Sequence, residues 1–511
     1  MAIVVSPQDP RFETLKGGHN LRWPEDSRDT AGRIYLCEDV GEVAEALQKA
    51  VAAGQRPTVR SGAHCYEDFV VNNPGGVILD LSLLTGAHKQ AGQSAIRIAP
   101  GTQLWDAYTD LYKRYGCTIP AGTCGTVGAG GHICGGGYGL LSRLYGLSCD
   151  WLTAVDILTV DAKGKVVART ADATHDPDLF RACRGAGGGN FGIITSYNFD
   201  KLPPAPRDVV QAQMFFKWAD VTEERFVRLL TSFGRYWETR GQDPATWGMF
   251  AVLSVRHAVN SSFGMTVQFL NSDGSCNDLS LLEEYLDGFS ACSGITTTSA
   301  AAALHRSNHA SMGSGDGSEL CIGSHTVRRR DWFLATGDEA GGPGTSRAKY
   351  KSAYFKRGFT EAQARCMYKH MHRTLPGTDL AGAVIEIDSY GGAINRKELI
   401  KGTAVCQRSS VIKIQPMAFW RDTECDGHYS QWLRDFYTDF FSGPDADSQY
   451  PGSPFPGGRH DGCYINYPDK DMLAFDYWPK LYYGDLYPFL QDVKRRYDPN
   501  NIFHHAMSIR I

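Results

Sequence analysis

The chain has 511 residues, of which 42% are hydrophobic and 21% charged, so it is long enough for a sizeable core and for two domains. Its formal net charge of -4 gives no electrostatic footprint for nucleic acid or for an anionic membrane, and we exclude both as partners. No stretch approaches the ~20 apolar residues of a membrane span and no signal peptide precedes the first strand, so we expect a cytoplasmic protein.

The first predicted unit is a strand, a helix and a second strand. The strands cover residues 33–36 and 57–60, and the helix between them covers 39–54 and begins at the capping residue Asp39. This order is typical of a βαβ unit. His64 follows the second strand closely, at the carboxyl end where α/β folds place ligands.

Further strands, a hairpin and a helix are predicted before residue 200. Their ranges are 75–81, 95–101, the hairpin 154–168, a helix from 176 and the strand 193–197. Gly187, Gly189 and Gly192 match the spacing of a dinucleotide fingerprint. Because a helix precedes these glycines and a strand follows them, the reverse of the fingerprint's order, we do not assign a dinucleotide site here.

The segment Pro203–Pro206 marks a boundary, after which longer strands and amphipathic helices are predicted. Asp220 is the expected cap of the first of these helices. The Arg328–Arg330 triplet is expected in a solvated loop. Strands are predicted at 213–218, 263–270, 383–388 and 411–415, and helices at 280–289, 360–375 and 428–441. The sequence therefore predicts a sheet covered by helices.

A stretch at residues 120–139 is nearly half glycine, which lets a backbone approach a large planar or phosphorylated ligand and direct N–H groups at it. Cys124 near its start and His64 are the candidate chemical pair. A metal site remains open, because His64, Cys65, Cys124, His132 and Cys134 are soft ligands without organising spacing, and His305 and His309 have that spacing without a third ligand. A Cys/His nucleophile pair also remains open.

Four motifs together resemble the berberine-bridge-enzyme-like flavoprotein oxidases, which have the vanillyl-alcohol-oxidase flavin fold. They are Arg60–His64, Pro120–Cys124, the glycines and histidine of residues 130–139, and Tyr464–Tyr467. The resemblance implies an α+β protein with a two-part FAD-binding domain, residues 1–205 and 451–511, and an inserted substrate-binding domain with a helix-covered antiparallel sheet, residues 206–450. It also implies FAD attached twice, through His64 to the flavin 8-methyl carbon and through Cys124 to its C6.

The resemblance extends to further cofactor-binding residues. They are Arg60, Ser61, Gly62, Ala63, Gly122, Thr123, Val127, Gly128, Gly131, His132, Gly135, Gly137, Gly192, Ile194, Tyr464, Asn466 and Asn501. Ala63 departs from the family, which usually has glycine there. Its methyl group is expected to be tolerated unless φ is positive at that position.

By the same resemblance, Tyr467 is the base that takes the proton of a substrate hydroxyl, and Tyr138 and Tyr390 line the site and lower its pKa. Asp388 is the alternative to Tyr390 as the partner of Tyr467. Tyr390 would then only pack at the rim of the cleft between the domains. The implied function is an oxidase that passes a hydride from an alcohol or hemiacetal carbon to FAD and then reduces molecular oxygen to peroxide. Implied substrates are bulky: oligosaccharides, glycosylated antibiotics or polycyclic products. Oxidative cyclisation or desaturation, and a non-catalytic natural-product-binding protein, are the alternatives.

Overall fold

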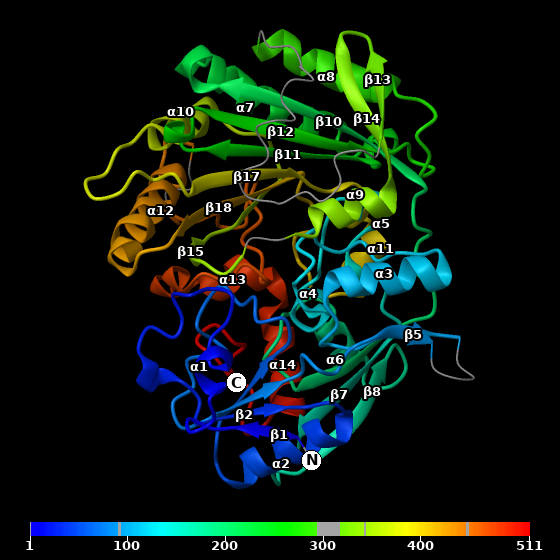
Figure 1. Cartoon of the computed structure of the whole chain (residues 1–511), viewed down its shortest axis with the longest axis vertical. Helices are drawn as coiled ribbons and strands as arrows, with labels where there is room; N and C mark the ends of the chain where they lie inside the picture. The colour runs from blue at the N-terminus through cyan, green and yellow to red at the C-terminus, as the bar shows by residue number, and fades with distance from the viewer. Residues whose placement is uncertain (1, 90–93, 294–316, 342–343, 446–448) are drawn as a thin grey trace.

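The computed structural model describes residues 2–89, 94–293, 317–341, 344–445 and 449–511. Its strands form three sheets, and Figure 1 shows the largest in the upper half of the molecule above the two smaller ones. Within the described residues, no helix combines the length and apolar character that a membrane crossing requires.

The first small sheet contains the predicted strand–helix–strand unit. Its strands are β1 (Ile3–Val5), β2 (Arg33–Leu36), β3 (Pro57–Arg60) and β4 (Val77–Asp80), in the order β1-β2-β4-β3, and helices α1 (Phe12–Leu15) and α2 (Val40–Ala52) accompany them. β4 lies between β2 and β3 and is parallel to both. The Asp39 side chain accepts a hydrogen bond from the Glu42 backbone and caps α2, as predicted. β3 ends at Arg60, directly before the loop that carries His64.

The second small sheet is antiparallel. Its strands are β5 (Ala87–Lys89), β6 (Ile96–Ile98), β7 (Ala154–Val160), β8 (Val166–Asp172) and β9 (Ile193–Phe199), in the order β5-β6-β9-β7-β8, with helices α3 (Leu104–Tyr115), α4 (Ala129–Cys134), α5 (Ser142–Tyr145) and α6 (Pro177–Cys183). The predicted hairpin is β7–β8, and Gly187–Gly192 lie between α6 and β9, as the sequence indicated. Part of the glycine-rich stretch is helical in α4, because small side chains let it pack closely at Pro100.

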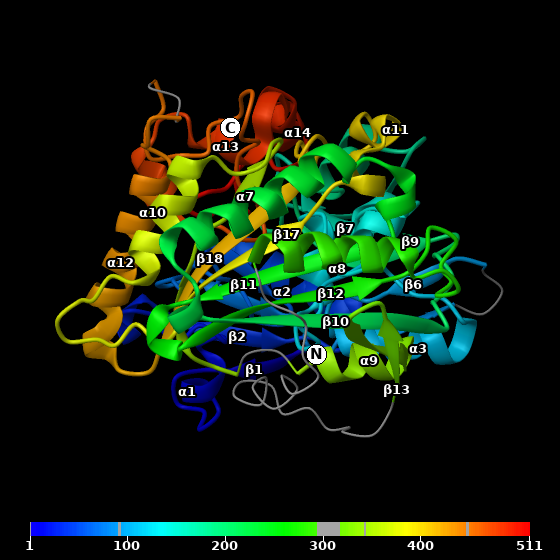
Figure 2. The same ribbon diagram turned by 90° about the horizontal axis from the view of Figure 1, so that it is seen from above.

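The large sheet is antiparallel and covered by helices, as predicted. Its strands are β10 (Asp208–Lys217), β11 (Met249–Arg256), β12 (Ser262–Phe269), β13 (Ser318–Ile322), β14 (His325–Asp331), β15 (Arg347–Tyr350), β16 (Ala353–Phe355), β17 (Ala383–Ser389) and β18 (Ile412–Trp420). The helices of this region are α7 (Glu223–Arg240), α8 (Ser280–Ser293), α9 (Trp332–Glu339), α10 (Glu361–Met371), α11 (Lys397–Ile400) and α12 (Asp426–Phe440). Figure 2 shows α7 and α8 lying across the outer face of this sheet.

Two local predictions in this region are wrong. Arg328–Arg330 belong to β14 and not to a loop, since Arg329 pairs with Asp208 and Arg330 with Asp338, which gives the charges partners on a strand. Helix α7 is capped by Thr222, whose hydroxyl accepts from the Arg225 backbone, and Asp220 lies in the preceding turn. His305 and His309 lie outside the described residues.

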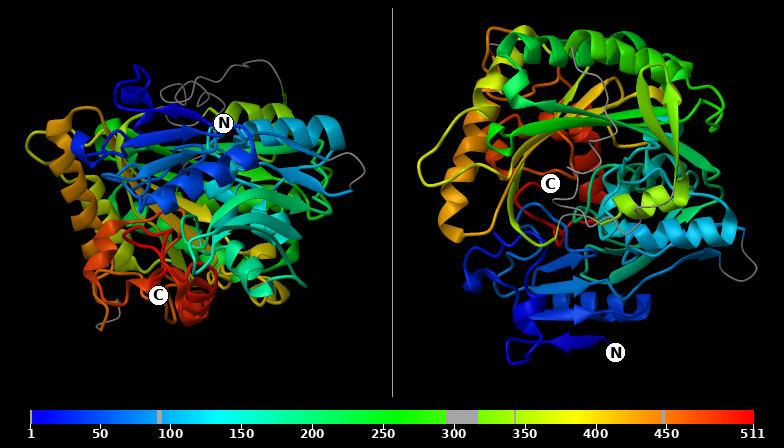
Figure 3. Two further views of the ribbon diagram at one scale, coloured as in Figure 1. Left: turned by 90° about the horizontal axis from the view of Figure 1, so that it is seen from below. Right: turned by 45° about the horizontal axis from the view of Figure 1, so that its top comes forward.

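The end of the chain returns to the first part. Helix α13 (Trp478–Tyr483) and helix α14 (Tyr487–Tyr497) form it, and the Lys494 ammonium donates to the Asn190 carbonyl oxygen at 2.6 Å. Figure 3 shows these red helices beside the teal elements of residues 150–200. The strands of the large sheet all lie within 208–420, while the domain boundaries at 205 and 450 stay a prediction.

Candidate active site

A cavity of about 1620 Å³ lies between the inner face of the large sheet and the glycine-rich segments. Most of the predicted site residues line it. They are Arg60, Ser61, Gly62, Ala63, His64, Gly122, Thr123, Cys124, Val127, Gly128, Gly131, His132, Tyr138, Gly192, Ile194, Tyr464, Asn466 and Tyr467. Segments from both ends of the chain and from its middle therefore build one site.

Three predicted cofactor residues lie outside the cavity lining. A side chain at Gly135 would collide with Asn466, 1.9 Å from its Oδ1 atom, and the Gly137 N–H donates to the Tyr464 hydroxyl at 3.1 Å. These two glycines hold lining residues and do not line the cavity themselves. Asn501 is exposed in a turn with φ of 50°, and the tail contributes Phe503–His505 instead.

His64 and Cys124 meet at the hydroxyl of Thr126, which the sequence did not single out. The His64 Nε2 atom lies 3.0 Å from Thr126 Oγ1, and the Cys124 Sγ atom lies 3.6 Å from it. The His19 ring stacks on the His64 ring with centroids 3.7 Å apart. Burial lowers the pKa of His64 to about 3, so its imidazole is neutral and keeps a lone pair.

The His64 loop and the Cys124 turn are packed backbone against backbone. A side chain at Gly62 would stand 2.2 Å from the Gly128 nitrogen, so only glycine permits this approach. Ala63 has φ of 59°, the condition under which its methyl group is unfavourable. The left-handed conformation costs an L-residue ~1–2 kcal/mol, so the departure at Ala63 is a strained one.

The glycine-rich stretch offers fewer free N–H groups than expected. The Gly125 nitrogen donates to the Ala340 carbonyl oxygen and the Gly130 nitrogen to that of Pro100, each at 2.9 Å. The Gly122 nitrogen donates to His132 Nε2, and burial lowers the pKa of His132 to about 4. By contrast, nothing lies within 4 Å of the point where Gly131 would carry a side chain. This open surface, beside a neutral imidazole and a free thiol, fits a large planar ligand such as a flavin.

Four polar groups gather at the sheet side of the cavity. The Tyr138 hydroxyl donates to Asp388 Oδ2 at 2.6 Å, and its oxygen lies 3.5 Å from that of Tyr467. The Lys413 ammonium donates to the Tyr138 hydroxyl, lies 3.5 Å from Asp388, and stands 4.1 Å from the centroid of the Tyr467 ring. A phenol pair is therefore enclosed between a carboxylate and a cation.

Burial dominates the proton affinities in this group. It lowers the pKa of Lys413 to about 8 and raises that of Tyr467 and Tyr138 well above 10. The expectation that neighbours lower the pKa of Tyr467 is therefore wrong in its net direction. The hydrogen bond to Tyr138 does act in the expected sense, but the loss of solvent outweighs it.

The alternation of residues along β17 and β18 explains why Asp388 and Lys413 lie at this site. Ile385 and Ile387 are fully buried, and so are Ile412 and Ile414 on the paired strand. The polar residues that alternate with them face the cavity side, since successive strand residues point to opposite faces. Lys413 lies directly opposite Asp388 in this pairing. A lysine alternating with isoleucines in a predicted strand was the signal that could have identified it.

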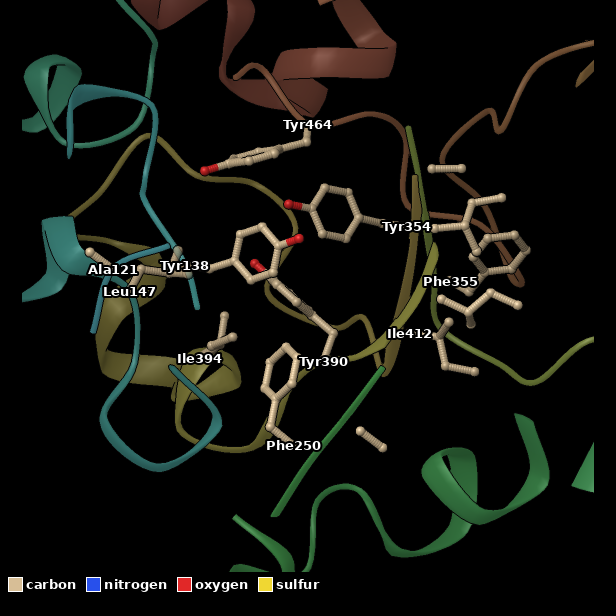
Figure 4. Packing of buried hydrophobic residues seen from close by; sticks show 14 of the residues in the cluster. Ala121, Tyr138, Leu147, Phe250, Tyr354, Phe355, Tyr390, Ile394, Ile412 and Tyr464 are labelled. Carbon is tan, nitrogen blue, oxygen red and sulfur yellow. The ribbon is translucent and has the colours of Figure 1, made fainter. Parts of the chain in front are cut away.

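Tyr390 does not line the cavity. Its side chain is 1% exposed, and its ring meets that of Tyr138 edge to face at a centroid distance of 5.9 Å. Figure 4 shows both rings in one cluster with Tyr354 and Tyr464. Tyr390 therefore packs behind Tyr138. We expected it to line the site, but it supports the Tyr138 ring instead.

Comparison with known families and proteins shows what the chain is similar to. Residues 31–169 match the family described as FAD binding domain, and residues 463–510 match the family described as Berberine and berberine like. The chain is 34% identical to aclacinomycin-N/aclacinomycin-A oxidase of Streptomyces galilaeus, covering 99% of this chain and 90% of that protein. It is 30% identical to hexose oxidase of Chondrus crispus, covering 98% and 93%. The crystal structure of a glycopeptide hexose oxidase complexed with teicoplanin superposes with a TM-score of 0.83 at 32% identity, covering 100% of this chain and 99% of that one.

Proposed function

The chain belongs to the berberine-bridge-enzyme-like FAD-linked oxidases, and we propose that it oxidises an alcohol or hemiacetal carbon of a bulky sugar, glycoside or glycosylated natural product. FAD held in this cavity would supply the hydride acceptor, with molecular oxygen taking up the electrons as hydrogen peroxide. The observation that carries the proposal is the contact of Tyr138 with Asp388, Lys413 and Tyr467 at the cavity that His64 and Cys124 also line.

The proposed attachment of FAD uses His64 and Cys124. Two covalent bonds would hold the flavin ring in place without bulky side chains packed around it. The cleft beside the ring would then stay open for a large substrate. The neutral state of His64 supports this role, because an uncharged imidazole nitrogen is a nucleophile. Cys124 supports it as a free thiol beside a hydroxyl group. Flavin that stays with the polypeptide after acid precipitation is the expected result, and colour released to the supernatant contradicts the attachment.

The proposed proton path begins at Tyr467. Its phenol takes the proton of the substrate hydroxyl while passing its own proton to the Tyr138 oxygen, 3.5 Å away. Tyr138 in turn gives its proton to Asp388 along the existing 2.6 Å hydrogen bond. A shared relay suits buried phenols with raised pKa, because no isolated phenolate has to form. The Lys413 ammonium beside both rings stabilises the negative charge that moves along the path.

The side chains that line the cavity are suited to binding a substrate with many hydroxyl groups. Its sheet side carries amide, hydroxyl, guanidinium and carboxyl groups, which pair with sugar hydroxyls, and aromatic rings, which pack on sugar faces. The polar residues are Gln211, Gln213, Ser254, Arg256, Thr266, Gln268, Arg328, Glu386 and Gln415, and the aromatic ones Phe250, Tyr350, Phe419 and Trp420. Trp23, from the segment before β2, also lines the cavity. The relatives include a hexose oxidase and a glycopeptide hexose oxidase, which supports the same class of substrate.

Anaerobic mixing tests the proposed function. The holoenzyme is mixed with D-glucose, cellobiose, xylobiose or a glycosylated aromatic natural product, and flavin absorbance is followed before air is readmitted. We expect one of these compounds to bleach the flavin. After air is readmitted, one molecule of hydrogen peroxide should form for each molecule of product, and the product should be two hydrogens lighter than the substrate. Binding without bleaching contradicts an oxidase, and a product with a new ring contradicts oxidation of a C–OH group.

A further inference from the structure

Both attachment candidates share one neighbour, the hydroxyl of Thr126, at 3.0 Å from His64 Nε2 and 3.6 Å from Cys124 Sγ. We propose that this hydroxyl prepares both side chains for attachment of FAD, accepting the Nε2–H hydrogen of His64 and donating its own hydrogen to the Cys124 sulfur. A hydroxyl has one hydrogen and two lone pairs, so it can serve both partners at once. The inference rests on the proposed attachment and makes Thr126 a positioning residue for it.

On the histidine side, the hydroxyl fixes the tautomer. When Nε2 carries the hydrogen and donates it to Thr126, the lone pair that can form a bond is at Nδ1 of His64. The His19 ring, stacked at 3.7 Å with an interplanar angle of 17°, holds the plane of that imidazole. Burial lowers the pKa of both rings, so the stack carries no charge at neutral pH. The ring is thus held in one plane and one protonation state.

On the cysteine side, the hydroxyl favours the reactive form of the sulfur. The thiolate is the nucleophile, and a hydrogen bond donated to the charged form stabilises it. Cys124 is half-buried and free, and the Val127 nitrogen donates to its carbonyl oxygen, which closes the turn that contains Thr126. The same hydroxyl group therefore acts on two nucleophiles through its two faces.

Close packing of glycines keeps Thr126 at this point. A side chain at Gly62 would stand 2.9 Å from the Thr126 carbonyl oxygen, so the His64 loop lies directly on the turn. A side chain at Gly125 would stand 2.6 Å from the Ala340 carbonyl oxygen and 2.9 Å from Trp105 Cβ. The turn that carries Thr126 is thus fixed from both sides.

Attachment at each residue is a two-electron oxidation, and molecular oxygen is the oxidant. The bond to His64 forms between Nδ1 and the methyl carbon, breaks one C–H bond, and releases the Nε2 proton through the Thr126 oxygen. The bond to Cys124 forms between sulfur and a ring carbon, and breaks one C–H and one S–H bond. Each step releases two protons and two electrons, which reduce one molecule of oxygen to hydrogen peroxide, so the two bonds consume two molecules of oxygen.

Peptide mass spectrometry tests the inference with readouts other than activity. Wild-type protein, Thr126→Val and Thr126→Ser are produced under flavin limitation and completed with FAD in air. Samples are taken over time, and the fractions of His64 peptide and Cys124 peptide that carry flavin are measured separately. Thr109→Val is the matched control, because its buried hydroxyl has no hydrogen-bond partner among the described residues. Thermal melting and FAD retained without a bond show whether each variant is folded.

Thr126→Val should slow both attachments about tenfold or more, while Thr126→Ser and Thr109→Val stay within about threefold of wild type. Attachment at wild-type rates in Thr126→Val overturns the inference, and so does the loss of one bond alone. Equal losses in the valine and serine variants also overturn it, because they would show a packing role. Should valine prevent folding, Thr126→Ala takes its place with the same outcomes. A wild-type protein without either bond instead overturns the proposed attachment.

Discussion

The Tyr138 hydroxyl donates a 2.6 Å hydrogen bond to Asp388, a residue 250 positions away in the sequence. Both groups are buried, so the bond is made where solvent does not compete for it. It joins the glycine-rich segment to strand β17. In the proposed proton path, Asp388 is the final acceptor of the proton that leaves Tyr467.

Replacement of Tyr467 by phenylalanine removes the first proton acceptor and keeps the ring. Because general-base catalysis contributes roughly 10² to 10⁴ in rate, anaerobic flavin reduction should slow by about that factor. The absorbance spectrum of the bound flavin should persist, which separates lost chemistry from lost folding. Stopped-flow spectroscopy measures both. A Tyr467→Phe variant that reduces its flavin at nearly the parent rate would falsify the assignment and make Asp388 the next candidate.

Lys413 should give the rate of flavin reduction a pH dependence. Burial lowers the pKa of this ammonium to about 8, so the charge is present below that pH and lost above it. As pH rises through about 8, the cation that stabilises charge on the phenols disappears, and flavin reduction should slow. Lys413→Met should be slow at all pH values and lack the inflection. An inflection near pH 8 that persists in Lys413→Met would assign it to another group.

Glu386 should make substrate affinity depend on pH. Burial raises the pKa of this carboxyl to about 7, and Glu386 lines the cavity beside β18. A carboxylate accepts hydrogen bonds from sugar hydroxyls more strongly than a neutral carboxyl does, so KM should fall as pH rises through about 7. Glu386→Gln, of equal size and without a titrating proton, should show a flat KM in the same range. The idea fails if the variant keeps the slope.

Substitution of Ala63 by glycine should stabilise the protein. Ala63 has φ of 59°, which costs an L-residue ~1–2 kcal/mol, whereas added glycine freedom in the unfolded chain costs ~0.4–1 kcal/mol. The free energy of unfolding should therefore rise by up to about 1.6 kcal/mol in denaturant titration. The matched control is Ala44→Gly within helix α2, which should lower it by about 1 kcal/mol. A fall at both positions would show that the methyl group of Ala63 is not strained.

Asp469 should be essential to stability. It pairs with Lys349 and Lys351, and all three are 2% exposed. Removing Asp469 takes from both buried ammonium groups their nearest carboxylate, at 2.5 Å, and leaves them the more distant Glu67 and Asp471. Asp469→Ala should lower the free energy of unfolding by roughly 3–5 kcal/mol. Glu45→Ala, which breaks an exposed pair with Lys49, should change it little. Equal effects of the two substitutions, measured by chemical denaturation, would contradict the proposed importance of the buried cluster.

The sequence by itself determined the local elements and the segments around the cofactor. The capping of α2 by Asp39, the hairpin β7–β8 and the glycine-rich approach to Gly131 depend on residues a few positions apart, so periodicity and turn residues suffice to predict them. The resemblance of their motifs to those of the family predicted His64, Cys124, Tyr138 and Tyr467 as site residues, and all four line the cavity.

Only the tertiary structure decided which groups act together and in which protonation state. The antiparallel register of β17 and β18 sets Lys413 opposite Asp388, and the fold brings both to Tyr138, 275 positions from Lys413. No local pattern encodes such a register, because it depends on how whole strands pair. The position of Tyr390 also depends on the tertiary structure. The sequence places this residue near the site, but only the packing shows that it lies behind Tyr138. The pKa values follow from burial, a property of the packed molecule and not of any segment.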